Sequence, residues 1–194
     1  GFGETKETDP FLLFDDFRND RPADYLAGFP WHPHRGIETI TYVLAGAVEH
    51  GDSLGNHGVL KGGDVQWMTA GSGILHQEMP RGNAKGQMHG FQLWANLPSN
   101  LKMTKPRYQD VKSKEIPEIV DDDGTAVRVV VGEFWGKTGP VVGVAAEPRY
   151  VDISVPPRKV TPQGNAFCVH RLQLRHRLIR RHPPHRLADG GGDV

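Results

Sequence analysis

The sequence predicts an all-β protein built from short antiparallel strands. Its 194 residues include 24 Gly and 15 Pro, which are spread along the chain as is typical of many turns between short elements. No alternation of strand and helix patterns is present, so a parallel α/β sheet is not expected. Segments rich in β-branched and aromatic residues between turn signals favour a sandwich or a barrel. The expected strands are 37–44, 65–68, 90–97, 126–131 and 150–155.

Composition and charge exclude several functional classes. Apolar residues make up 37% of the chain, enough for a packed core, and the formal net charge is zero, so no general attraction to nucleic acid or to anionic membranes is expected. No run of 18 apolar residues is present, which predicts that the protein does not span a membrane. The single cysteine, Cys168, excludes an intramolecular disulfide. A cytoplasmic location is predicted, with a nuclear one also open if the source is eukaryotic.

The last part of the chain, residues 168–194, differs from the rest. It carries six Arg and two Asp, hence +4, and contains no Phe, Trp or Tyr. A second barrel needs about six or more strands, and too few residues follow position 167 to supply them. A basic tail without a core and a reading-frame error are the two interpretations. A nucleic-acid-binding arm is disfavoured, because no aromatic residue accompanies the arginines.

Two short motifs predict a metal site. His32-Pro33-His34 and His76-Gln77-Glu78 each place two metal-binding side chains two residues apart. Residues i and i+2 of a strand point to the same face, so each motif presents a pair of ligands to one space. Three imidazoles and a carboxylate suit iron, manganese, copper, nickel or zinc, whereas magnesium and calcium prefer oxygen ligands. An isolated pair of histidines is weak evidence, and the second motif is what makes the prediction strong.

Other residues near the motifs carry weaker predictions. Glu38 is a candidate fifth ligand, a partner of a ligand, or half of a surface ion pair. Gly71-Ser72-Gly73 is expected to form a tight bend before His76. Phe29, Trp31, Trp67 and Met68 are candidates for a wall that excludes water, or for plain core. For the remaining histidines we expect His57 in a solvated turn, His89 beside the site and His50 in a surface loop.

Three stretches resemble the pirin family of the cupin superfamily. They are DPFLLFDDFR at 9–18, FPWHPHRGIETITYVL at 29–44 and GDVQWMTAGSGILHQEMP at 63–80. The resemblance covers about residues 9–167. It implies a bicupin of two antiparallel jelly-roll barrels, the first of which holds one divalent transition metal, usually Fe(II), through His32, His34, His76 and Glu78. The second barrel is expected to be incomplete here, because the resemblance ends near Phe167.

The resemblance also implies a domain division and a function. We expect an N-terminal metal-binding cupin at 1–105, a connection at 106–125, the start of a C-terminal cupin at 126–167 and a divergent basic tail at 168–194. The implied activity is quercetin 2,3-dioxygenase chemistry, in which a flavonol and dioxygen react and Glu78 acts as the catalytic base. The alternative is a metal- or redox-dependent regulator that binds a transcription factor or a metabolic enzyme without turnover.

Overall fold

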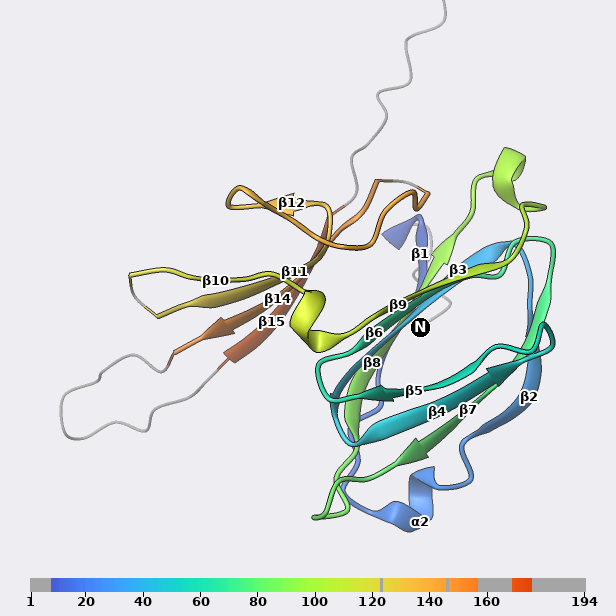
Figure 1. Ribbon diagram of the computed structural model, residues 1–194, viewed down its shortest axis with the longest axis horizontal. Coiled ribbons are helices and arrows are strands. Elements are labelled where there is room, and N and C mark those ends of the chain that lie inside the picture. Colours follow the sequence, from blue (N-terminus) through green and yellow to red (C-terminus); the bar gives the residue numbers. More distant parts are fainter. Residues whose placement is uncertain (1–7, 123, 146, 157–168, 176–194) are drawn as a thin grey trace, which may run out of the picture.

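The computed structural model describes residues 8–122, 124–145 and 147–156, together with the backbone of 169–175. The first part of the chain forms two facing sheets that make a flattened barrel (Figure 1). One sheet has the strand order β1 (Phe11–Asp16), β8 (His89–Asn96), β3 (Ile37–Ala45), β6 (Val65–Thr69) and β9 (Arg107–Val111). The other has the order β2 (Phe29–His34), β7 (Ile74–Arg81), β4 (Ala47–Asp52) and β5 (His57–Lys61). The predicted all-β cupin fold is therefore confirmed.

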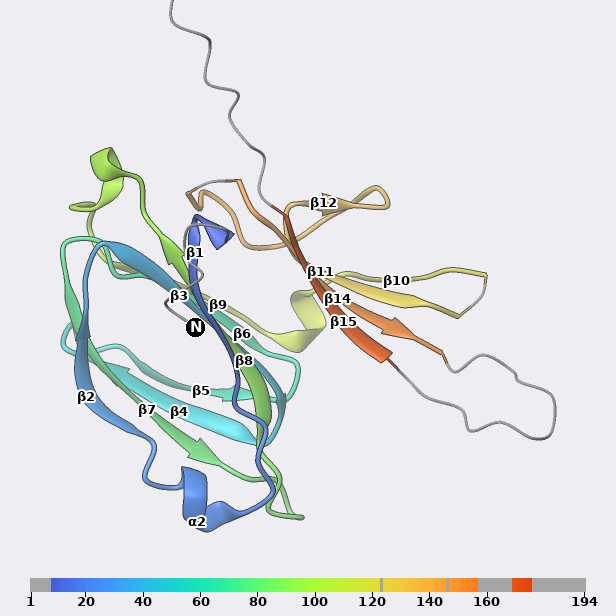
Figure 2. The same ribbon diagram turned by 180° about the vertical axis from the view of Figure 1, so that it is seen from behind.

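A smaller sheet packs against the barrel. Its strands, in order, are β10 (Glu118–Val120), β11 (Ala126–Val131), β14 (Arg149–Val155) and β15 (Val169–Arg175). A hairpin of β12 (Glu133–Phe134) and β13 (Lys137–Thr138) lies beside it, and Figure 2 shows the same arrangement from behind. Every pair of named strands in the described part of the chain is antiparallel.

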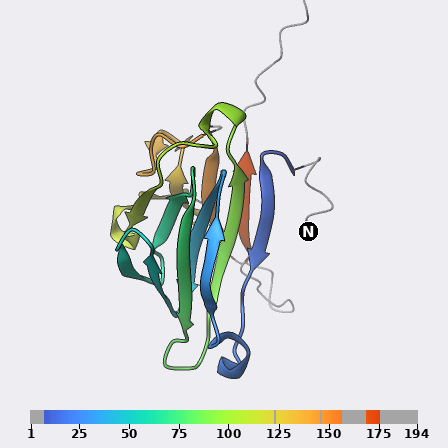
Figure 3. The same cartoon turned by 90° about the vertical axis from the view of Figure 1, so that its right-hand side faces the viewer.

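Helical structure is limited to short segments. The four-residue helix α2 (Pro22–Tyr25) lies at one end of the barrel (Figure 3), and two 3-10 turns follow at η2 (Ser99–Leu101) and η3 (Ser113–Glu115). None of the helices among the described residues is long and apolar enough to cross a lipid bilayer.

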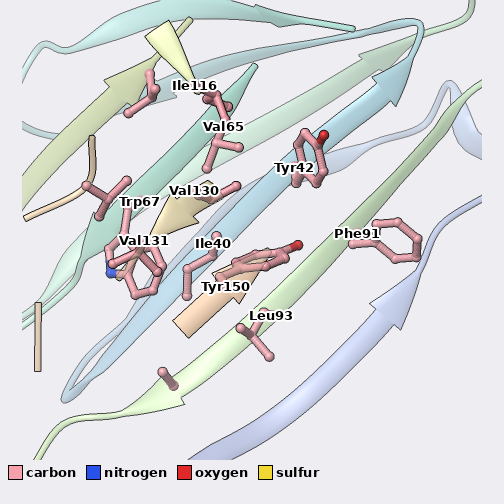
Figure 4. Packing of buried hydrophobic residues seen from close by; sticks show 13 residues of the cluster. Ile40, Tyr42, Val65, Trp67, Phe91, Leu93, Ile116, Val130, Val131 and Tyr150 are labelled. Atoms are coloured by element: carbon pink, nitrogen blue, oxygen red, sulfur yellow. The ribbon is translucent and has the colours of Figure 1, made fainter. Parts of the chain in front are cut away.

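The main apolar core lies between the five-stranded sheet and the smaller sheet (Figure 4). Ile40, Tyr42 and Trp67 of the barrel pack there against Val130 and Tyr150. Because successive side chains of a strand alternate between faces, Ile40 and Tyr42 of β3 face the small sheet while Thr39 and Thr41 face the barrel interior. The barrel interior therefore receives polar side chains such as Thr41 together with the apolar Val43 and Met68.

Two segments of the expected domain division contain strands in the structure. The expected connection at 106–125 contains β9, which pairs with β6 of the barrel, and β10, which pairs with β11. β9 reads RYQDV and lacks an apolar alternation because it is an edge strand, where charged residues are common. The predicted tail at 168–194 lies outside the described residues except for β15, whose backbone pairs with β14. There the sequence alternates Leu172 and Leu174 with polar residues, a strand period of two.

Candidate metal centre

The two predicted motifs occupy neighbouring strands of the four-stranded sheet. His32 and His34 lie on β2, and His76 on β7 is the register partner of His32. Directly paired residues of antiparallel strands share a face, so the three imidazoles project together. His34 and His76 are buried, with 8% and 1% of their surface exposed, whereas His32 is half-buried.

The three imidazoles converge on one point. All three ligand nitrogens lie within 4.8 Å of one another, and Nε2 of His32 is 3.1 Å from Nε2 of His34. The ring centroid of His76 is 4.4 Å from that of His32 and 4.9 Å from that of His34. Two nitrogens that bind one ion at about 2.1 Å each are separated by about 3 Å, so this spacing fits a single transition-metal ion.

Protonation and hydrogen bonding also fit a metal. Burial, followed by the neighbouring imidazoles of His76 and His32, lowers the pKa of His34 from 6.5 to about 4. Burial and the His32 imidazole likewise lower the pKa of His76 to about 4. Both rings are therefore neutral at pH 7 and keep a lone pair for a metal. Neither nitrogen of His76 has a hydrogen-bond partner, although both are buried, and a metal bond would satisfy one of them.

The lowered pKa values predict how the stability of the metal-free protein depends on pH. In the unfolded chain His34 and His76 bind protons near pH 6.5, but in the fold they do so only near pH 4. The unfolded state therefore holds more protons between these values, so the free energy of unfolding should fall as the pH drops from about 6.5 to about 4. Urea unfolding of metal-free protein at several pH values checks this. A stability that stays constant across the window would contradict it.

Glu78 lies next to the cluster rather than inside it. It is 4% exposed and points from β7 to the same side as His76, two residues earlier. Its Oε1 accepts a hydrogen bond from Oγ1 of Thr41 at 2.8 Å, and its Oε2 accepts one from Nε2 of Gln92 at 3.0 Å. The group of ligand atoms within 4.8 Å contains the three histidines and not Glu78. The structure thus brings together three of the four predicted ligands, with the fourth adjacent.

Glu38 is not at the site. The turn at Gly36 separates β2 from β3, so a count of alternating faces from His34 does not carry over. Glu38 is 2% exposed and accepts a hydrogen bond from Oγ1 of Thr69 at 2.7 Å, on the face of β3 that turns away from the histidines. Burial raises the pKa of this carboxyl. The suggestions of a ligand and of a surface ion pair were both wrong.

The other histidines also separate from the cluster. His50 was expected in a surface loop, but it is buried on β4, where its Nε2 lies 3.0 Å from Nε2 of Gln66. The sequence His50-Gly51-Asp52 resembles a turn, yet β4 continues to Asp52 because β7 and β5 pair with it on both sides. His57 is exposed, as predicted. His89 lies beside Asp16, with 3.6 Å between its Nε2 and Oδ1 of Asp16, and is not part of the cluster of His32, His34 and His76.

The expected aromatic wall is mostly elsewhere. Trp31 is more than half exposed and Trp67 packs toward the small sheet, whereas Phe29, although more than half exposed, lines a cavity that Glu78 also lines. Trp94, which the sequence analysis missed, instead packs edge-on against His34 with 5.0 Å between ring centroids. The signal that could have found it is the alternation on β8, where Gln92 and Trp94 fall on the face opposite to the apolar residues.

A cavity of about 310 Å³ adjoins Glu78. Thr41, Glu78 and Gln92, the residues that share the hydrogen bonds described above, are among its lining. The apolar part of the wall is formed by Phe17, Phe29, Val48, Pro80 and Met88. Other charged and polar residues also line it: Asp15, Arg18, Asn19 and Asp24. The cavity therefore suits a molecule with an apolar body and some polar groups.

Comparisons with known proteins show which family this chain resembles. Residues 1–95 match the family model described as Pirin. A pirin-like protein of Caulobacter vibrioides is 48% identical over 157 residues, which cover 80% of this chain and 56% of that protein. A crystal structure of quercetin 2,3-dioxygenase from Acinetobacter baumannii is similar with a TM-score of 0.67 at 38% identity, over 76% of this chain and 53% of that one. A bacterial pirin from Escherichia coli in complex with nickel(II) has a TM-score of 0.54 at 26% identity, over 75% and 56% of the two chains.

Two facing antiparallel sheets with a histidine cluster on one inner wall define the cupin class of metal-binding barrels. Within that class, the chain belongs to the pirin family. It spans about half the length of the curated relatives that it matches.

Proposed function

We propose that the barrel holds one Fe(II) ion through His32, His34 and His76, with Glu78 as the fourth ligand, and that it catalyses the dioxygen-dependent ring opening of a flavonol such as quercetin. The observation that supports this is the convergence of three imidazoles next to Glu78, a residue that also lines a cavity. The name of the similar Acinetobacter baumannii protein supports the same substrate class.

Different residues of the chain would have different roles in this reaction. A bound metal would supply Lewis acidity toward a hydroxyl and a neighbouring carbonyl oxygen of the substrate. Glu78 is proposed to accept the hydroxyl proton on a carboxylate oxygen, because it lines the cavity and lies two residues from His76 on β7. Phe29, Val48 and Met88 would contact the flat apolar rings and exclude water. Both oxygen atoms of dioxygen enter the products, and one ring carbon leaves as carbon monoxide, so no external reductant is needed.

The test compares purified wild-type protein with His34→Ala and with His57→Ala. We expect the wild type and His57→Ala to contain iron and to consume quercetin under oxygen, since the exposed His57 lies outside the cluster. His34→Ala should lose both properties. Metal analysis and the loss of quercetin absorbance are the two measurements. Bound iron without any loss of absorbance would refute the dioxygenase proposal and favour the regulatory alternative. Iron retained by His34→Ala would refute the ligand set.

A further inference from the structure

Two hydrogen-bond donors from the opposite wall of the barrel hold the Glu78 carboxylate. Thr41 on β3 and Gln92 on β8 are register partners, and each donates to a different oxygen of Glu78, at 2.8 and 3.0 Å. Nε2 of Gln92 also donates to Oγ1 of Thr41 at 3.2 Å, which leaves the Thr41 hydrogen for Glu78. The three side chains therefore form a closed network in which both carboxylate oxygens are engaged.

The charge of Glu78 has no cationic partner in this network. Thr41 and Gln92 are neutral donors, and within the described part of the chain no lysine, arginine or histidine forms an ion pair with Glu78. A buried carboxylate is stabilised by hydrogen bonds or by a cation. The two donors and an ion in the histidine cluster therefore compete for the same lone pairs of Glu78.

We propose that Thr41 and Gln92 are positioning residues that hold the Glu78 carboxylate toward the cavity and weaken its bond to the metal, so that Glu78 remains available to accept the substrate proton. The role as proton acceptor rests on the proposed function, whereas the effect on metal binding does not. Two observations carry the proposal: Glu78 lies outside the histidine cluster, and all three members of the network line the cavity.

The test removes one donor and keeps the shape of its side chain. Thr41→Val leaves Oε1 of Glu78 without its donor, and we expect cobalt(II), used as the probe metal, to bind about tenfold more tightly, as expected from a difference of one hydrogen bond to a carboxylate. The visible absorption of bound cobalt(II) should change, because Glu78 becomes a stronger ligand. With iron loaded, kcat for quercetin should fall about tenfold or more while KM changes little.

Matched variants separate positioning from folding. Thr39→Val makes the same replacement two residues earlier on the same buried face of β3 and should leave cobalt(II) affinity unchanged. Thr41→Ser keeps the hydroxyl, so it should bind cobalt(II) with the same affinity as the wild type. In a Glu78→Gln background, Thr41→Val should have no effect on affinity, since the competing carboxylate is gone.

Several outcomes would overturn the proposal. Cobalt(II) affinity that falls or stays constant in Thr41→Val would mean that the donors do not compete with the metal. An equal gain in Thr39→Val, or in the Glu78→Gln background, would assign the effect to packing. If the wild type never consumes quercetin but Thr41→Val still tightens cobalt(II) binding, the dioxygenase function fails while the positioning of Glu78 by Thr41 stands.

Discussion

Replacement of His76 by leucine is expected to abolish metal binding and yet leave the metal-free fold at least as stable as the wild type. The metal affinity should fall by more than about a hundredfold, since loss of residues that merely orient a ligand already costs about 10- to 100-fold. The stability expectation follows from burial: the His76 side chain is 1% exposed and neither of its nitrogens has a hydrogen-bond partner. Unsatisfied buried polar groups cost about 1–3 kcal/mol, and leucine of similar size removes that cost.

The wild type should therefore become more stable than the His76→Leu variant when metal is added, which reverses their order in the metal-free state. At a free metal concentration of about 100 times the dissociation constant, the wild type gains about 2.7 kcal/mol and the His76→Leu variant gains almost nothing. Denaturant unfolding of both proteins, with a chelator and with metal, measures the four values. A control variant, His57→Leu, changes an exposed histidine outside the cluster and should respond to metal as the wild type does. A metal-free His76→Leu protein that unfolds far more easily would show that the imidazole is chiefly a packing element.

His32 and His34 were predictable as a pair because their relation is local. His32 and His34 share a face through the strand period of two, and no information about the rest of the fold is needed for that inference. The pairing of β2 with β7 then brought His76 beside His32. Glu38 was not predictable in this way, because the turn between β2 and β3 interrupts the alternation.

The hydrogen-bond partners of Glu78 could not be predicted from the sequence, because their relation to Glu78 is not local. Thr41 and Gln92 are 37 and 14 residues away from Glu78 in the chain. Their contact with it depends on how the two sheets face each other across the barrel, and no local pattern states this. His50 shows a related limit, since its burial comes from strands that pair on both sides of β4.

The second large effect is expected from a substitution of Gly71, in the bend before β7. Gly71 has a φ of +51°, and a Cβ atom built there would collide with the backbone carbonyl oxygen of Thr104. Gly36, in the turn after His34, donates its N–H to the carbonyl oxygen of Gly71 at 2.8 Å. Because the Gly36 turn follows β2 and the Gly71 turn precedes β7, the two strands that carry the clustered histidines, a displaced Gly71 should disturb the spacing of the imidazoles as well as the fold.

Gly71→Ala is therefore expected to lower the free energy of unfolding by about 3 kcal/mol or more and to weaken metal binding. Gly55→Ala is the matched control, because Gly55 has a φ of +88° but no atom within 4 Å of the added Cβ. The control bears at least as much backbone strain, which costs about 1–2 kcal/mol, so any further loss in Gly71→Ala measures the collision. Urea unfolding and cobalt(II) binding of both variants provide the comparison. Equal losses of stability with unchanged metal affinity would mean that the turn yields locally and that the histidines are positioned by strand pairing alone.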